Sequence, residues 1–158
     1  MEKVLLVTPE RCIGCGSCEL ACSFNKSGQF KPSVSRVGVH RFEKGQNVPM
    51  MCFQCDEAPC AKACKPQALH KGTSGLVEFD KDKCIGCRMC VMACPFGNVS
   101  YDRSAKELVK CDQCGGDPQC VQFCPTKAIE YLPAESAVLN KKRRFAKRIS
   151  DALEEVKD

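Results

Sequence analysis

The chemistry of this sequence is concentrated in its cysteines. The 158-residue chain contains sixteen cysteines, which form four groups of four with none left over. The first and third groups share the spacing C-x2-C-x2-C-x3-C, whereas the second and fourth lengthen the middle gap to four and five residues. The groups are Cys12, Cys15, Cys18 and Cys22; Cys52, Cys55, Cys60 and Cys64; Cys84, Cys87, Cys90 and Cys94; and Cys111, Cys114, Cys120 and Cys124. Four related segments of this kind constitute an internal repeat.

This spacing indicates iron-sulfur clusters. Three thiolates at two-residue intervals on a compact loop can ligate three iron corners of one cubane, and a fourth cysteine three residues later turns towards a second cubane. Zinc would use two C-x2-C pairs per tetrahedral site, which leaves the third and fourth cysteines of each group without a role. A disulfide scaffold needs an oxidising compartment and does not predict four copies of one spacing. We therefore expect four [4Fe-4S] clusters, with a three-iron cluster at one site as an alternative.

Strand signals between the groups indicate which groups act together. After the second group the chain reads A-L-H-K, G-T-S-G and L-V-E-F-D, which predicts a hairpin leading into Cys84. Groups two and three are therefore expected to form one ferredoxin-like module. Residues 4–7 and 128–132 are expected to pair as the edge of a second module, with residues 36–42 and 107–110 as its other strands. The prediction is an α+β fold in which one bacterial-ferredoxin-like module is inserted into the other.

The nested arrangement fixes an expected ligand set for each cluster. We expect an outer module at residues 1–45 and 104–133, an inner module at 46–103 and a C-terminal helix at 134–158. The fourth cysteine of each group then ligates the cluster of its partner group. The expected sites are site A, Cys12, Cys15, Cys18 and Cys124; site B, Cys111, Cys114, Cys120 and Cys22; site C, Cys52, Cys55, Cys60 and Cys94; and site D, Cys84, Cys87, Cys90 and Cys64. Pairing group one with two and three with four is an alternative that uses the same sixteen ligands.

Three segments resemble the iron-sulfur subunits of molybdenum and tungsten pterin oxidoreductases, a family that includes the dimethyl-sulfoxide reductase beta subunits. They are C-F-Q-C-D-E-A-P-C-A-K-A-C, C-I-G-C-R-M-C-V-M-A-C-P and C-D-Q-C-G-G-D-P-Q-C-V-Q-F-C-P-T-K-A-I. The resemblance covers about residues 3–133 and implies four clusters with nested pairing. The short gap in group four is most similar to the small iron-sulfur subunits of tungsten aldehyde oxidoreductase and of the benzoyl-CoA reductase complex. Two departures are the absence of Pro after Cys22 and the late position of Pro66.

The resemblance implies an electron relay within a multisubunit oxidoreductase. Its expected partners are a large tungsten or molybdenum pterin catalytic subunit of the aldehyde oxidoreductase type and a flavin subunit carrying FAD, with a quinone pool or soluble ferredoxin as other acceptors. The sequence itself contains no recognisable catalytic base, nucleophile or phosphate loop, so we expect no catalysis by this protein alone. The alternatives are a free polyferredoxin shuttle and a redox-sensing or iron-storage protein. End-to-end self-association, which would lengthen the row of clusters, is a further hypothesis.

The charge balance fits buried anionic clusters. A formal net charge of +5 would ordinarily suggest nucleic acid or an anionic membrane as a partner. Four oxidised clusters would add about −8, leaving the loaded protein near −3, so no nucleic-acid partner is expected. The sequence lacks an apolar run of the roughly 18 residues that a transmembrane helix needs. Clustered cysteines and the lack of an export signal predict a cytoplasmic location.

Residues beside the ligands are expected to shape the sites. Gly14 and Gly86 lie between the first two cysteines of their groups, where a missing Cβ lets backbone N–H groups approach cluster sulfides. Apolar neighbours such as Ile13, Ile85 and Phe96 are expected to be core residues that exclude water.

The cysteine-free tail, residues 134–158, predicts one amphipathic helix. Its apolar positions at helical spacing are Val138, Phe145, Ile149, Ala152, Leu153 and Val156. Packing on its own domain and docking on a partner subunit or another copy are both open. A membrane-surface position is disfavoured, because the acidic stretch 151–158 would be repelled by anionic lipid.

Overall fold

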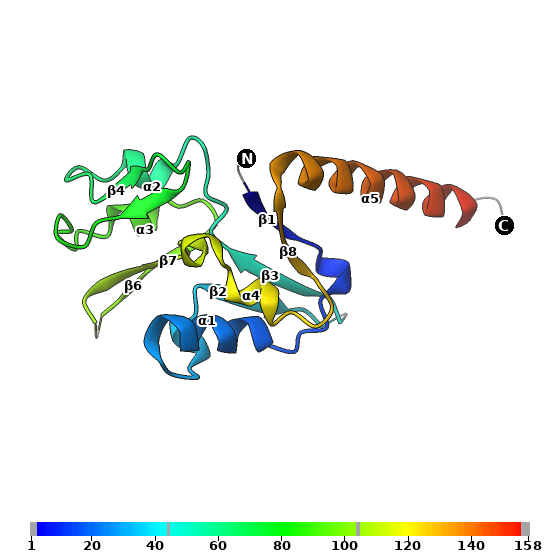
Figure 1. Cartoon of the computed structure of the whole chain (residues 1–158), viewed down its shortest axis with the longest axis horizontal. Helices are drawn as coiled ribbons and strands as arrows, with labels where there is room; N and C mark the ends of the chain where they lie inside the picture. The colour runs from blue at the N-terminus through cyan, green and yellow to red at the C-terminus, as the bar shows by residue number, and fades with distance from the viewer. Residues whose placement is uncertain (1–2, 44, 104, 156–158) are drawn as a thin grey trace.

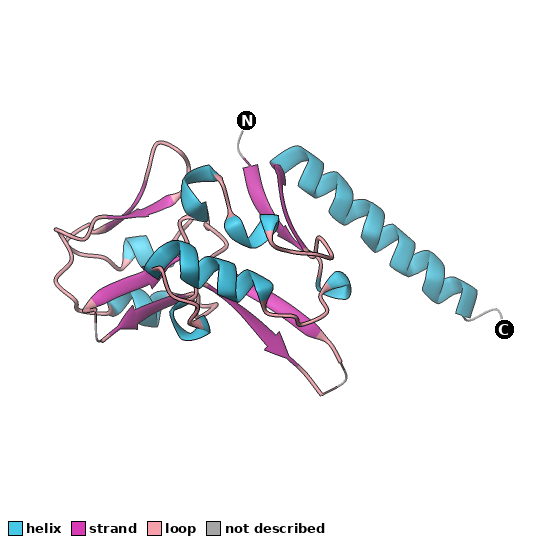
Figure 2. Cartoon of the chain, turned by 60° about the horizontal axis from the view of Figure 1, so that its bottom comes forward, coloured by secondary structure: helices cyan, strands magenta, loops and turns pink. Residues whose placement is uncertain are grey.

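The computed structural model describes residues 3–43, 45–103 and 105–155. Within these ranges, eight short strands pair two by two into four antiparallel sheets, and helices connect or follow them (Figure 2). The strands are β1 (Lys3–Val7), β2 (Val37–Arg41), β3 (Asn47–Met51), β4 (Leu69–Lys71), β5 (Val77–Phe79), β6 (Val99–Asp102), β7 (Glu107–Lys110) and β8 (Ile129–Pro133). The α-helices are α1 (Ser17–Ser27), α2 (Pro59–Lys62), α3 (Met89–Ala93), α4 (Gln119–Gln122) and α5 (Ala134–Glu155). The fold is thus a mixture of helices and strands.

Two of the expected strand pairings are confirmed. β1 pairs with β8 from Lys3 opposite Pro133 to Val7 opposite Ile129, which joins the two flanks of the cysteine-rich region. β4 pairs with β5, from Leu69 opposite Phe79, and forms the predicted hairpin between groups two and three.

The expected role of residues 107–110 as an outer strand is wrong. This segment, β7, pairs with β6, and Leu108 belongs to the same buried cluster as Leu69 and Val99. Residues 36–42 do form a strand, β2, but its partner is β3 across a short connection. Pairing with the neighbouring strand is favoured here, because closing a short loop costs less conformational entropy than closing a long one.

β3 is difficult to recognise in the sequence because Pro49 interrupts it. Proline cannot donate to a strand ladder and usually marks an edge strand. Opposite Pro49 lies Val39, whose N–H donates instead to Glu19 Oε1 at 2.9 Å. Pro49 therefore occupies a position where the sheet requires no N–H from β3.

The interior consists of two core clusters in which cysteines lie among apolar side chains. The first contains Cys18, Cys22, Val37, Val39, Met51, Cys120 and Ile129. The second contains Ala58, Cys60, Leu69, Val77, Cys90, Val99 and Leu108. Figure 1 shows the elements of the second cluster in one lobe, separated from the lobe that contains β1, β8 and α1. Neither core is built from aliphatic side chains alone, so whatever binds the cysteines forms part of the core.

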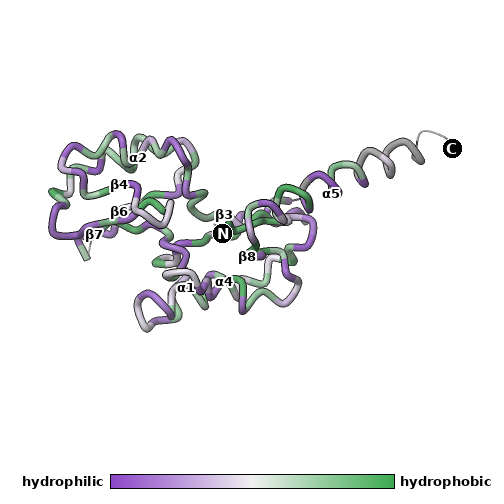
Figure 3. The backbone as a smooth tube through the Cα atoms, turned by 45° about the horizontal axis from the view of Figure 1, so that its top comes forward, coloured by the Kyte–Doolittle hydropathy of each residue, from purple (hydrophilic) through white to green (hydrophobic). Residues whose placement is uncertain are grey.

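α5 confirms the predicted helix over residues 134–155 and projects away from the two lobes (Figures 1 and 2). It contacts β1 and β8, and Ala137 is buried there. Farther along, Val138, Leu139 and Phe145 are 54%, 56% and 64% exposed. Hydrophobic and hydrophilic residues alternate along the helix (Figure 3). The expected apolar position Val156 lies outside the described residues.

None of the helices in the described part of the chain combines the length and apolar character needed to cross a bilayer.

Candidate metal centres

Three hollows in the structure are each lined by four cysteines drawn from two different groups. Their empty volumes are similar, at about 300, 330 and 360 Å³. Their cysteines are Cys12, Cys15, Cys18 and Cys124; Cys52, Cys55, Cys60 and Cys94; and Cys64, Cys84, Cys87 and Cys90. These are the combinations expected for sites A, C and D. In each one, the fourth cysteine comes from a group other than that of its three neighbours.

The remaining four cysteines also come together, around Cys120. Burial, together with negative charge on neighbouring thiolates, raises the pKa of this thiol to about 12. The three largest thiolate contributions come from Cys111, Cys22 and Cys114. Cys22, Cys111 and Cys114 therefore lie close enough to Cys120 to affect its charge, as expected for site B.

The four sets of cysteines follow one another through the molecule. Cys18 of site A also acts on the pKa of Cys120, so sites A and B are adjacent. Burial, with a smaller contribution from Cys52 of site C, raises the pKa of Cys111 to about 11, so B and C are neighbours. Sites C and D draw on the same two cysteine groups.

The backbone beside the second cysteine is left-handed in every group. Gly14 and Gly86 have φ of +70° and +68°, and Gln54 and Gln113 occupy the same position with φ of +51° and +53°. The conformation, rather than the absence of a Cβ alone, is therefore the shared requirement. At Gly14 a Cβ would also lie 2.6 Å from Asn47 Oδ1. Sequence reasoning missed the two glutamines, although C-x-Q-C aligns with C-x-G-C.

A common turn follows the fourth cysteine in groups two, three and four. The residue three positions later donates its N–H to the cysteine carbonyl and has positive φ. These bonds are Gln67 to Cys64 at 3.0 Å, Gly97 to Cys94 at 3.3 Å and Lys127 to Cys124 at 3.2 Å. The late proline of group two, Pro66, leaves this turn unchanged.

Backbone N–H groups donate to the sulfur of the fourth cysteine in groups one, two and four, which is the cysteine expected to ligate the cluster of another group. Leu69 N–H lies 3.3 Å from Cys64 Sγ, and Ala128 N–H lies 3.2 Å from Cys124 Sγ. Cys22, which lacks a following proline, receives an equivalent bond at 3.3 Å from Arg36, fourteen residues away. Such N–H donors stabilise negative charge on sulfur and fix the direction of each side chain.

The apolar residues expected to seal the sites lie at their rims. Ile13, Ile85 and Phe96 each line a hollow, yet they are 64%, 73% and 51% exposed. The expectation that they are core residues is wrong. The Phe96 ring instead meets Phe53 edge-on, with ring centroids 4.9 Å apart. The hollows therefore lie close to the molecular surface, and these apolar side chains stand between them and the solvent.

The donor chemistry of these sites fits iron-sulfur clusters. Burial raises the pKa of Cys18 to about 12 and also raises the pKa values of Cys60 and Cys90, so these thiols must release their protons to solvent when they ligate iron. Exposed Cys15 differs, because its contact with Ser17 lowers its pKa. In the described residues, no three His, Cys, Asp or Glu side chains converge closely enough to hold a single metal ion. The donor set of each hollow is four thiols, which is the ligand type that iron-sulfur clusters use.

Comparison with known proteins also indicates iron-sulfur sites. Residues 43–133 match the 4Fe-4S dicluster domain and residues 5–25 the 4Fe-4S binding domain. The protein is 43% identical over 122 residues to the polyferredoxin-like subunit of aliphatic sulfonate oxidoreductase from Pyrococcus furiosus, a match that covers 76% of this sequence and 70% of the relative. It is 36% identical over 150 residues to the B component of anaerobic dimethyl sulfoxide reductase from Escherichia coli, covering 82% and 72%.

A solved structure shares the fold. One polypeptide of the active site complex BamBC of benzoyl coenzyme A reductase, in complex with 1,5-dienoyl-CoA, superposes with a TM-score of 0.50 over 97% of both proteins at 24% identity. Together with the relatives above, this confirms the family resemblance carried by the cysteine motifs. The free shuttle is not favoured, because both relatives are named as parts of oxidoreductases. The protein belongs to the 4Fe-4S dicluster family and is an iron-sulfur electron-transfer subunit homologous to subunits of oxidoreductase complexes.

Proposed function

We propose that this protein holds four [4Fe-4S] clusters at sites A, B, C and D and relays single electrons along them. The observation that carries the proposal is that twelve of the sixteen cysteines line three hollows in sets of four, each set drawn from two groups. Each set contains three cysteines of one group and the fourth of another, which is the cross-ligation typical of two-cluster ferredoxins. When bound, each cluster supplies one-electron storage.

The proposal includes the division into an outer and an inner module. Its boundaries differ from those expected from the sequence, because each now keeps the β2–β3 and β6–β7 hairpins whole. The outer module comprises residues 3–51 and 111–133, and the inner module comprises residues 52–110. Met51 of β3 packs in the first core cluster and Leu108 of β7 in the second, which supports these limits. The inner module is then a continuous stretch inserted into the outer one.

The protein's own residues hold the clusters and restrict access of water. Thiolates ligate iron, backbone N–H groups donate to ligand sulfur, and buried side chains such as Val39, Val77 and Leu69 line the hollows. Low polarity around a cluster disfavours extra negative charge, whereas hydrogen bonds to sulfur favour it. Because the sites are adjacent, one electron can pass from each to the next without any bond being made or broken.

We further propose that the protein is a non-catalytic subunit in the cytoplasm that serves a catalytic partner. The partner is a large tungsten or molybdenum pterin subunit of the aldehyde oxidoreductase type, and a flavin subunit or another acceptor receives the electrons. The Pyrococcus furiosus and Escherichia coli relatives, both named as parts of oxidoreductases, support a role within a complex. Cysteines that ligate iron rather than form disulfides are typical of a reducing compartment.

Anaerobic purification from native cells tests the proposal. We expect about sixteen irons per molecule, reducible paramagnetic centres and co-elution with a large subunit that contains tungsten or molybdenum. A protein that eluted alone with a full set of clusters would support the shuttle instead. Stoichiometric zinc, or iron for only two clusters, would contradict the proposed sites.

A further inference from the structure

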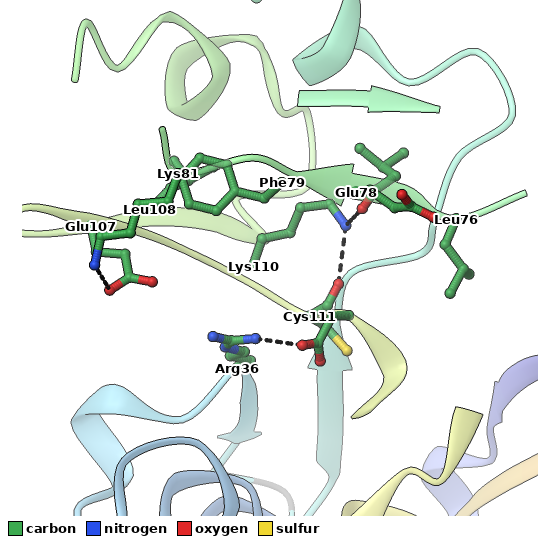
Figure 4. Close-up of a pocket in the computed structure, with 11 residues that line it drawn as sticks. Arg36, Leu76, Glu78, Phe79, Lys81, Glu107, Leu108, Lys110 and Cys111 are labelled. Carbon is green, nitrogen blue, oxygen red and sulfur yellow. Dashed lines mark hydrogen bonds and ion pairs between the residues drawn. The ribbon is translucent and has the colours of Figure 1, made fainter. Parts of the chain in front are cut away.

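A buried lysine lies where the two lobes meet. Lys110 ends β7 directly before Cys111, a residue of site B, and it is only 5% exposed. Figure 4 shows its side chain extending between the strands, with its nitrogen linked to the Cys111 carbonyl oxygen. A fully buried lysine is rare unless its charge is compensated.

The surroundings of Lys110 fit a protonated ammonium group. Its Nζ donates to the carbonyl oxygens of Val77 at 2.8 Å and Cys111 at 3.0 Å, and to Gln54 Oε1 at 3.1 Å. Three acceptors match the three N–H donors of the charged form. All three acceptors are neutral, so they solvate the positive charge without cancelling it.

Gln54 positions this ammonium between two sites. It lies between Cys52 and Cys55 of site C, and its Nε2 donates to the Cys111 carbonyl at 2.7 Å. Its Oε1 also accepts the N–H of Val77, which lines the hollow of site C, at 2.9 Å. Lys110 and Gln54 therefore join the backbone that carries ligands of site C to the backbone that carries ligands of site B.

Other cations near site B differ from Lys110 in having a carboxylate partner. Lys26 and Arg36 pair with Asp112 at 2.9 and 3.0 Å, and this carboxylate is half exposed. A further hollow is lined by Lys110, Arg36 and Asp112 among others, and in it Lys81 pairs with Glu107 and is 65% exposed. Water and a counter-charge screen these groups, whereas the field of Lys110 acts in a medium of low polarity.

We propose that Lys110, positioned by Gln54, is a potential-determining residue that raises the reduction potentials of sites B and C together. This inference rests on the proposed four-cluster relay. Reduction adds one negative charge to a site, and a nearby uncancelled cation stabilises the reduced form. An electron that crosses between the lobes therefore meets its most favourable position at the junction, with no proton or bond displaced.

The test measures the midpoint potential of each cluster by anaerobic redox titration followed by electron paramagnetic resonance. The variant Lys110→Met removes the charge but keeps a long side chain, and Lys110→Arg keeps the charge. Lys81→Met is the matched control, because it changes the net charge equally from an exposed position in the same hollow. Cys94→Ser and Cys114→Ser assign potentials to sites C and B.

In Lys110→Met we expect the reduction equilibrium constants of two clusters, those of sites B and C, to fall at least tenfold. This corresponds to a shift of about 59 mV to lower potential for a one-electron couple. Sites A and D, Lys110→Arg and Lys81→Met should remain close to the parent protein. Equal shifts in Lys110→Met and Lys81→Met, or no shift in either, would overturn the inference.

Iron content and thermal melting separate an electrostatic role from a packing role. Lys110→Gln retains two N–H donors and is the second neutral variant if Lys110→Met fails to fold. Loss of clusters in both neutral variants with retention in Lys110→Arg would support the need for charge, whereas loss in all three would assign Lys110 to packing and refute the inference. If the parent protein itself lacks sixteen irons, the four-cluster relay fails rather than the role of Lys110.

Discussion

At the scale of single residues, the group to which a cysteine belongs in the sequence does not determine which cysteines lie beside it in the structure. Cys124 is the last cysteine of group four, but it lines a hollow with three cysteines of group one. Cys64 and Cys94 are exchanged in the same way between groups two and three. The spacing within a group predicts that its fourth cysteine turns towards another cluster, and the strand signals between the groups predict which one.

This exchange predicts which pairs of cysteine substitutions affect the same cluster. Cys15→Ser combined with Cys124→Ser should remove or alter a single cluster, costing about four irons, because both residues belong to site A. Cys15→Ser combined with Cys120→Ser should affect two clusters and cost about eight irons. Iron and acid-labile sulfide analysis measures the difference. A loss of about eight irons from both double variants would instead favour ligation within each group.

The two left-handed glutamines are predicted to differ in their contribution to stability. Gln54→Gly leaves the Val77 N–H without its side-chain acceptor and removes one of the three acceptors of Lys110, so the free energy of unfolding should fall by about 2–3 kcal/mol. Gln113→Gly also relieves a left-handed backbone, and Gln113 Oε1 has no hydrogen-bond partner in the structure. Its free energy of unfolding should stay within about 1 kcal/mol of the parent value. Anaerobic melting of the loaded proteins provides the comparison, and equal losses would show that Gln54 has no special role.

At the scale of elements, local hairpins are the least predictable feature. β3 contains Pro49, so its sequence argues against a strand, and the sequence favours a distant partner for β7 instead of β6. The alternation in E-L-V-K does place Lys110 on the same buried face as Leu108, but a lysine at a strand end is normally read as exposed. Its burial depends on Gln54, which lies 56 residues earlier, and no local pattern carries that information.

α5 is predicted to be dispensable for the clusters and required for assembly with a partner. It follows β8, and its exposed residues Val138, Leu139 and Phe145 contribute little to either core. A protein ending at Pro133 should retain its iron and its potentials but lose the partner subunit during gel filtration. Val138→Ser combined with Phe145→Ser keeps the helix and tests its apolar face alone. Loss of iron from the truncated protein would instead mean that the helix stabilises the fold.

At the scale of the whole molecule, folding and cluster binding are predicted to be one process. Both core clusters include cysteine side chains, and few large apolar residues are fully buried. Removing iron with a chelator under oxidising conditions should therefore abolish cooperative melting and increase digestion by protease, since ligation energy is folding energy in such proteins. Adding ferrous iron and sulfide anaerobically should restore both properties. A cluster-free protein that still melts cooperatively would contradict this view.

The pairing of β1 with β8 and the exchange of Cys124 also determine an order of events during synthesis. Once the residues up to the end of β7 have emerged from the ribosome, every cysteine of sites C and D and both hairpins beside them are available. The centres at A and B remain open, because Cys124 and the closing strand β8 emerge last. The nascent protein can thus mature from its middle outwards, and a message truncated after residue 110 would still encode one complete pair of centres.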